Sequence, residues 1–262
     1  MKLLLTNDDG IDAEGIKVLA RTLSAENEVF VVAPDVNNSA ASNRMTIEKA
    51  MNFIKKDMGI PSVKDSYALS GTPADCVFSG IGVFGNDFDL VLSGINNGPN
   101  LGTDIIYSGT CGAARTACLN GLPAVALSID TGSRDSDDQS GCLYYENLAL
   151  FVKNNLEQLK NLCGNKILFE NHSLIEYFVN VNAPAMKKIK GVKFANPCYR
   201  RYYEKIERTE NTSKLVGSGK IVSYRNEIND ACVCSEGYIS VSAVQSEPAF
   251  KNMNTIENTF TI

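Results

Sequence analysis

Two adjacent carboxylates follow the first apolar run of the chain. Three leucines at positions 3–5 are typical of a short buried strand, and the turn-forming run Asn7-Asp8-Asp9-Gly10 ends it. Open α/β sheets bind their ligands outside the carboxyl ends of the strands, where Asp8 and Asp9 would stand. Neighbouring acids repel each other, and a hard cation such as Mg²⁺ removes the repulsion. The alternative is that this run only makes a turn.

Two further polar loops would supply oxygen ligands at the same edge of the sheet. Ser39 follows a buried strand expected at Val29–Ala33, and Asn96 follows another expected at Phe88–Leu92. A hydroxyl and an amide carbonyl beside the two aspartates would form a hard-oxygen shell with positions left for water. We therefore expect one divalent cation per subunit, Mg²⁺ or Mn²⁺, with Ca²⁺ also compatible with oxygen ligands.

A fourth segment, Ser108-Gly109-Thr110, precedes a small-residue helix expected at Cys111–Leu119. Backbone N–H groups and hydroxyls at a helix start bind anions, so these residues and Asn96 are candidate phosphate ligands. Ser108 would also serve as a plain N-cap. A cation beside a phosphate favours phosphoryl transfer. The attacking group is then either a water on the cation or one of the catalytic candidates Asp8 and Asp9, and both remain open.

Other catalytic or metal chemistries find little support in the composition. The chain has one histidine, His172, and no tryptophan. A Ser-His-Asp arrangement would have to use His172, which we interpret as a surface loop residue because it lies in a polar turn. The eight cysteines lack the paired C-x-x-C spacing of zinc sites, and we expect most of them to be small buried residues.

Charge and hydropathy limit the partners. The 262 residues carry a formal net charge of -5, which argues against a nucleic-acid polymer or an anionic membrane. No apolar run approaches the roughly 18 residues of a membrane span, and the N-terminal run is shorter than the about 7–15 apolar residues of a secretory signal. We therefore expect a cytoplasmic protein with a small-molecule substrate.

The order of predicted elements indicates the fold class. Apolar residues recur at helical spacing in Ile16–Leu23 and again in Leu143–Leu162, where we expect the longest helix. Strand–helix–strand units predict an α/β fold with a Rossmann-like, mostly parallel sheet and helices on both faces. We expect one domain over residues 1–262, with a core at about 1–195 and extended C-terminal β-hairpin or arm elements at about 196–262.

Several motifs of the chain resemble those of the SurE family, the stationary-phase survival proteins. In chain order they are Leu5–Ile11, Asn38–Asn43, Gly71–Val77, Ser93–Gly102 and Tyr107–Thr110. The resemblance covers residues 1 to about 130 firmly, and Asn180–Pro184 and Glu236–Val241 more weakly. Several long motifs in the same order are far more specific than any one of them.

The resemblance implies a metal-dependent 5′/3′-nucleotidase that hydrolyses nucleoside monophosphates and, in some members, short polyphosphate. It implies that the metal is held by Asp8, Asp9, Ser39 and Asn96, the residues gathered above from the loops. It also implies a homodimer or homotetramer in which C-terminal arms are exchanged.

The chain departs from the family pattern at several positions. The family usually has basic residues before Ser39 and a glycine after it, where this chain has Val36, Asn38 and Ala40. Substrate contacts in this loop are therefore open. The run from Arg200 to Tyr203 matches no family motif and would either bind a base or phosphate, or be a solvated arm at a subunit interface.

Two hypotheses compete with the nucleotidase. Receiver domains of signalling proteins also place an acid pair after the first strand and bind Mg²⁺, but they are about half this length. They also need a phosphoacceptor aspartate and a late lysine, whereas the late strand here ends at Ser128. The altered loop around Ser39 would suit a protein that binds nucleotide without turning it over.

Overall fold

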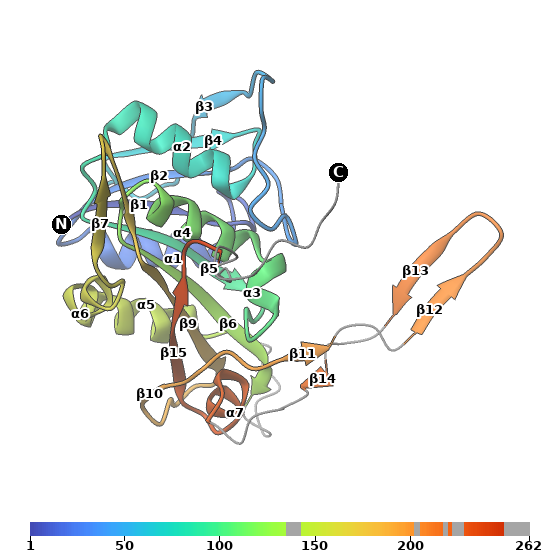
Figure 1. Cartoon of the computed structure of the whole chain (residues 1–262). Coiled ribbons are helices and arrows are strands. Elements are labelled where there is room, and N and C mark those ends of the chain that lie inside the picture. The colour runs from blue at the N-terminus through green and yellow to red at the C-terminus, as the bar shows by residue number, and fades with distance from the viewer. Residues whose placement is uncertain (135–142, 202–204, 217–219, 222–227, 249–262) are drawn as a thin grey trace, which may run out of the picture.

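The computed structural model describes residues 1–134, 143–201, 205–216, 220–221 and 228–248. Within them, the strands of the main sheet are β1 (Lys2–Thr6), β2 (Glu28–Pro34), β3 (Phe53–Lys55), β4 (Asp65–Leu69), β5 (Leu90–Asn97), β6 (Ala124–Arg134), β9 (Tyr177–Ala185), β10 (Val192–Phe194) and β15 (Ile239–Gln245). Their order is β10-β15-β9-β6-β5-β1-β2-β4-β3. Only β3 with β4 and β9 with β15 pair antiparallel among these strands, so the predicted mostly parallel sheet is confirmed (Figure 1).

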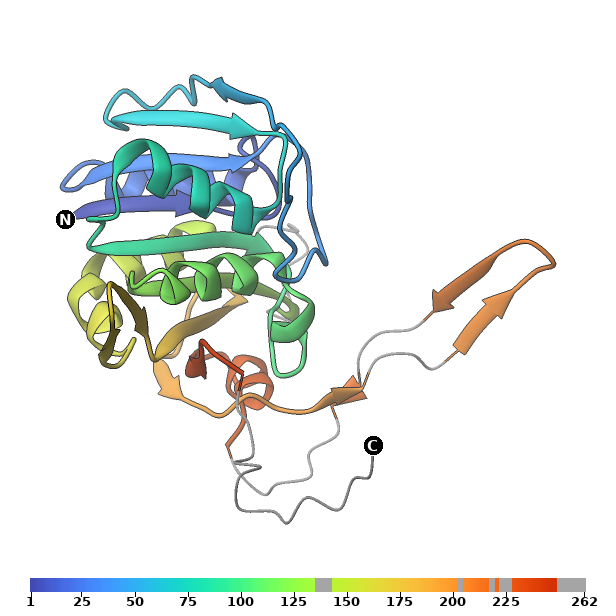
Figure 2. The same cartoon turned by 45° about the horizontal axis from the view of Figure 1, so that its top comes forward.

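Helices cover both faces of the sheet, as expected. They are α1 (Glu14–Leu23), α2 (Pro73–Phe84), α3 (Asp104–Tyr107), α4 (Gly109–Leu119), α5 (Tyr145–Asn154), α6 (Leu156–Asn161) and α7 (Asp230–Ser235). Helix α1 packs beside α5, and α2 packs beside α4 on the opposite face, which Figure 2 turns toward the viewer. Helix α2 begins with a capping box in which Thr72 and Asp75 satisfy each other's backbone N–H groups.

Strand β1 lies at the centre of the sheet and of the core. Its three leucines, residues 3–5, are fully buried, and each such side chain contributes about 1.5–3 kcal/mol to folding. The chain runs from β1 outward to β2 and β4, then returns to place β5 on the other side of β1. The connections after β1 and β5 therefore diverge, which makes the crevice at their carboxyl ends the expected binding position of this fold class.

Two local predictions were wrong. The single helix expected over Leu143–Leu162 is two helices, α5 and α6, because Asn155 leaves the helical conformation at φ -132 and ψ 21. Its side-chain amide donates to the carbonyl of Phe151 at 2.7 Å, a local bond that competes with the helix. His172 is exposed as expected, but it begins strand β8 (His172–Ile175), which pairs with β7 (Lys166–Phe169), rather than lying in a loop.

The C-terminal part forms the predicted arm. Strand β11 (Arg200–Arg201) pairs with β14 (Lys220–Ile221), and beyond them β12 (Lys205–Arg208) and β13 (Ser213–Val216) form a hairpin that projects from the body (Figures 1 and 2). Tyr202 and Tyr203 of the run that begins at Arg200, and the cysteine Cys142, lie outside the described residues. Among the helices that are described, none combines the length and apolarity needed to cross a membrane.

Candidate functional site

The turn after β1 leaves both aspartate side chains available for other roles. Asn7 closes the turn: its amide donates to the carbonyl of Gly10 at 2.8 Å, and its Oδ1 accepts from the N–H of Gly10 at 3.2 Å. Gly10 has φ +104, which glycine adopts without a steric cost. Because Asn7 and Gly10 satisfy the turn, the turn itself does not require the carboxylates of Asp8 and Asp9.

Asp8 is a buried acid held by the start of α4. Asp8 is only 3 % exposed. Its carboxylate accepts from the hydroxyl of Thr110 at 2.7 Å and from the N–H of Thr110 at 3.3 Å. Burial raises the pKa of Asp8 to about 6, the Thr110 hydroxyl opposes this rise, and the neighbouring charge of Asp9 adds to it. A negative charge here is therefore unfavourable unless a cation accompanies it.

Asp9 is half-buried and is held from the other side of the crevice. Its carboxylate accepts from the N–H of Asn97 at the end of β5 at 2.9 Å, and from the amide of Asn37 at 3.4 Å. Burial also raises the pKa of Asp9, and the bond from Asn97 lowers it. The two acids are thus anchored to β5, α4 and the loop after β2, which fixes their relative position.

The loop after β2 brings Ser39 to the aspartates. The N–H of Asn38 donates to the carbonyl of Asp8 at 2.7 Å, and the N–H of Ser39 donates to the side chain of Asn37 at 2.9 Å. Ser39 is exposed and lines a cavity of about 610 Å³. Residues around this cavity include Asp8, Ser39, Ala40, Asn96, Asn97, Pro99, Asn100, Asp104, Tyr107 and Ser108. The structure therefore brings Asp8, Ser39, Asn96 and Ser108 to one cavity, as the loops suggested.

Ala40 occupies the place where the resemblance led us to expect glycine, and its φ is +58. An L-residue in this left-handed conformation costs roughly 1–2 kcal/mol, which glycine avoids. We expect Ala40→Gly to raise the free energy of unfolding by about 0.5–1 kcal/mol, measured by chemical denaturation. Ala41→Gly, next in the chain and at a negative φ, is the control and should lower it by a similar amount. Equal effects of both variants would contradict strain at Ala40.

Asn96 presents one oxygen to the cavity side of β5. Its amide nitrogen donates to the carbonyl of Gly98 at 2.9 Å, so Oδ1 is the atom of this side chain that suits a cation or a phosphate proton. Asn96 is half-buried at the carboxyl end of β5, next to the crevice between β1 and β5. Its position agrees with the predicted role in which an amide carbonyl completes an oxygen shell.

The segment Ser108-Gly109-Thr110 begins α4, and each of its residues has a defined contact. Ser108 is the N-cap, with its hydroxyl accepting from the N–H of Cys111 at 3.0 Å. A Cβ on Gly109 would lie 3.0 Å from the Cβ of Asp8, so glycine lets the helix start approach the acid. The N–H and hydroxyl of Thr110 both point at Asp8. Of these three residues, Ser108 lines the cavity, whereas Thr110 orients the carboxylate.

The donor set fits a hard divalent cation. It combines the carboxylates of Asp8 and Asp9 with the neutral oxygens of Ser39 and Asn96, which is the ligand chemistry of Mg²⁺ and Mn²⁺. Burial, and to a smaller extent the charge of Asp9, raise the pKa of Asp8, and a bound cation would offset this cost of ionising Asp8. In the described part of the chain, no group of three or more histidine, cysteine or acidic residues offers another metal position. The described cysteines are free, and all but Cys232 are buried, as expected.

Sequence reasoning missed several residues that shape the site. Asn97 fixes Asp9 through its backbone, and Asn100, Asp104 and Tyr107 line the cavity from the segment between β5 and α4. Asn100 is held by β9, where the side chains of Asn180 and Asn182 both donate to its carbonyl. The resemblance motif Ser93–Gly102 covers Asn97 and Asn100, but nothing local in the sequence signals Asp104.

The fold and the site define a doubly wound α/β protein with an acid pair at the point where the strand order reverses. The model of the family described as Survival protein SurE matches residues 3–204. The proteins named 5′-nucleotidase SurE of Histophilus somni and Clostridium botulinum (strain Eklund 17B / Type B) are 36% and 34% identical, over 98–99% of this chain and 98–100% of theirs. The crystal structure of the SurE protein from Aquifex aeolicus superposes with a TM-score of 0.74 at 28% identity, covering 98% of this chain and 97% of that one. This chain therefore belongs to the SurE family.

Proposed function

We propose that this protein is a divalent-cation-dependent 5′/3′-nucleotidase, which hydrolyses nucleoside monophosphates and short polyphosphate to release phosphate. The carrying observation is the cavity of about 610 Å³ that brings Asp8, Ser39, Asn96 and Ser108 together. Relatives that match over almost their whole length are named 5′-nucleotidase, which supports the same chemistry here.

In the proposed mechanism each residue has a separate task. Asp8 and Asp9 hold the cation together with Ser39 and Asn96, and Thr110 keeps the Asp8 carboxylate in place. Bound Mg²⁺ or Mn²⁺ would polarise a phosphoryl oxygen and lower the pKa of a water molecule that attacks phosphorus. The hydroxyl of Ser108 and the second N–H of the Asn96 amide would donate to phosphate oxygens, while Oδ1 of Asn96 faces the cation. The attacking water would give a proton to bulk water, the P–O bond to the nucleoside would break, and the leaving oxygen would take a proton from bulk water.

Phosphate release from a panel of nucleoside 5′- and 3′-monophosphates and short polyphosphate tests this function. Each substrate is assayed with Mg²⁺, with Mn²⁺ and with EDTA. We expect release that requires a cation, and the panel ranks the bases and the ester position. Folded protein that releases no phosphate from any substrate in either metal would contradict the proposal and favour a nucleotide-binding role.

Cation affinity should depend on pH. The raised pKa of Asp8, about 6, means that a proton competes with the cation below pH 6 and does so weakly above pH 7. We expect the affinity for Mn²⁺, measured by calorimetry between pH 5 and 8, to fall by about tenfold per pH unit below 6 for each proton displaced. By the same sign, Asp8 makes the cation-free protein less stable as pH rises through 6. An affinity that is flat over this range would contradict a ligand role for Asp8.

We also propose that the projecting β12–β13 hairpin is exchanged between copies, giving a homodimer or homotetramer. These strands pair with each other, and Ile206 on the hairpin is 61% exposed. An apolar side chain on a projecting arm is a typical feature of an interface. Light scattering should give at least a dimer mass for the full chain, and Ile206→Glu should shift it toward monomer; a monomeric full chain would contradict the proposal.

A further inference from the structure

We infer that Arg200 is a positioning residue of the cavity: its guanidinium neutralises the Asp104 carboxylate in the cavity wall and so permits an anionic group to bind beside Asp8. This inference rests on the proposed function, because it concerns the phosphate that the site would bind. It gives a role within the site to an arm residue for which the sequence left base binding, phosphate binding and subunit contact open.

The pair is close and largely excluded from water. Nη1 of Arg200 donates to Oδ2 of Asp104, and the two side chains are 16% and 9% exposed. Removing one member of such a pair leaves the other charge without compensation in a poorly solvated place. Asp104 itself lines the cavity, so an uncompensated charge there would act directly on what the cavity binds.

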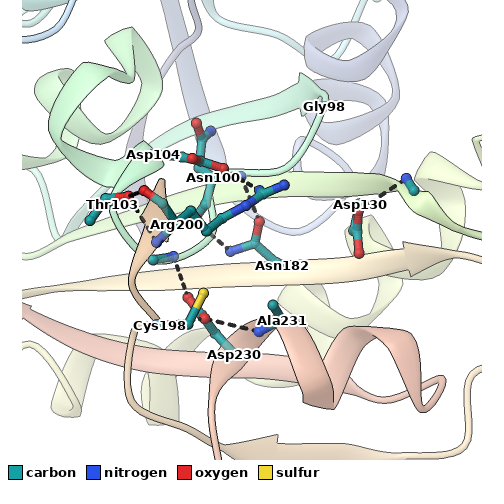
Figure 3. A network of polar contacts seen from close by, with 12 residues as sticks. Gly98, Asn100, Thr103, Asp104, Asp130, Asn182, Cys198, Arg200, Asp230 and Ala231 are labelled. Carbon is teal, nitrogen blue, oxygen red and sulfur yellow. Dashed lines mark hydrogen bonds and ion pairs between the residues drawn. The ribbon is translucent and has the colours of Figure 1, made fainter. Parts of the chain in front are cut away.

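The backbone around the pair is tied on both sides. Thr103 donates its hydroxyl to the carbonyl of Arg200 at 2.5 Å and accepts from the N–H of Arg200 at 3.2 Å. Asp230 accepts from the N–H of Gly102, one residue before Thr103, at 2.7 Å, and from the N–H of Cys198, two residues before Arg200, at 2.9 Å. Figure 3 shows these contacts joining the cavity segment, residues 98–104, to the arm root, residues 198–200. The guanidinium is therefore delivered to Asp104 by fixed backbone.

Charge accounting at the cavity shows why this neutralisation matters. Among the described residues that line the cavity, Asp8 and Asp104 are acidic and none is basic. A divalent cation shared by Asp8 and Asp9 would balance those two acids, which leaves the charge of Asp104 facing a phosphate dianion. From the loop after β2 only the uncharged Ser39 and Ala40 line this cavity, whereas Arg44 of the same loop donates to the side-chain oxygen of Asn38 at 3.3 Å and does not line it. Arg200 supplies the balancing charge for Asp104.

Calorimetric titration of the Mg²⁺-loaded protein with inorganic phosphate at pH 8 tests the inference, alongside KM and kcat for the best nucleotide of the panel. Arg200→Met should weaken phosphate binding and raise KM by about tenfold with little change in kcat. Arg200→Lys should stay within about threefold of the wild type. The double variant D104N/R200M removes both charges and should recover most of the affinity lost in Arg200→Met. Lys160→Met breaks the Lys160–Asp89 pair at the far end of β5 and is the control, with unchanged kinetics.

The variants separate charge from structure. If D104N/R200M binds phosphate as poorly as Arg200→Met, or if Arg200→Met binds as well as the wild type, the inference is overturned. A wild-type protein that binds no phosphate overturns it as well. The titration needs no turnover, so the two proposals can fail separately. If the wild type hydrolyses no nucleotide but D104N/R200M recovers the phosphate affinity that Arg200→Met loses, this inference is upheld and only the proposed function is rejected.

Discussion

Replacing Asp8 with asparagine is expected to lower the rate of phosphate release by about three orders of magnitude. Asp8 is the buried member of the acid pair, and its negative charge would be the strongest attraction for a cation in the cavity wall. Loss of one well-placed electrostatic contact in a closed site lowers kcat by about 10²–10³, and weaker cation binding adds to this. Steady-state release of phosphate at saturating Mg²⁺ measures the effect.

The same substitution should leave the fold intact. Asparagine retains an oxygen that accepts from the N–H of Thr110, and its amide can donate to the Thr110 hydroxyl. Because an ionised Asp8 is unfavourable without a cation, Asp8→Asn should melt no lower than the wild type in EDTA at pH 8. Asp12→Asn is the matched control: it lies on the same connection, is 63% exposed and pairs with Lys56, and should keep full activity. Cation-dependent turnover in Asp8→Asn near the wild-type rate would remove Asp8 from the mechanism.

The sequence predicts well those features that depend on strand direction. Apolar runs such as residues 3–5 indicate parallel strands, and parallel strands place their carboxyl ends at one edge. That rule alone brings Asp8, Ser39 and Asn96 together, and the structure finds Asp8, Ser39 and Asn96 around one cavity. The rule of strand direction does not predict which hydrogen-bond donor at this edge contacts which acceptor. The hydroxyl and N–H of Thr110 were expected to face an anion, and the structure aims both at Asp8.

Features that depend on distant contacts or on competition between local bonds were not predictable. The apolar stripe continues on both sides of Asn155, so periodicity alone predicts one helix. In the structure the helix breaks at Asn155, whose side chain donates to the carbonyl of Phe151. Asp104 and Arg200 are 96 positions apart, and their pairing follows from how α7 and the arm root fold back over the segment after β5. No local spacing rule relates residues so far apart.

Replacing Asp230 with alanine is expected to lower the free energy of unfolding by about 3–5 kcal/mol. Asp230 is fully buried and accepts from three backbone N–H groups, those of Gly102 at 2.7 Å, Cys198 at 2.9 Å and Ala231 at 2.9 Å. Each buried donor left without an acceptor costs about 1–3 kcal/mol. The arm root and the cavity segment would lose their common anchor together (Figure 3). Chemical denaturation, followed by circular dichroism, measures the change.

Two variants decide whether the loss comes from the missing acceptor. Asp230→Asn keeps one acceptor oxygen, which can still serve Cys198 and Ala231, and should cost about half as much as alanine. Asp87→Ala removes a 73% exposed carboxylate that pairs with Lys2 and should cost far less than Asp230→Ala, because water screens an exposed ion pair. If Asp230→Ala is no less stable than Asp87→Ala, the three N–H groups find other acceptors and Asp230 is not the anchor. If alanine and asparagine cost the same, the bonds to Cys198 and Ala231 contribute little, because the charge and the acceptor for the N–H of Gly102 are absent from both variants.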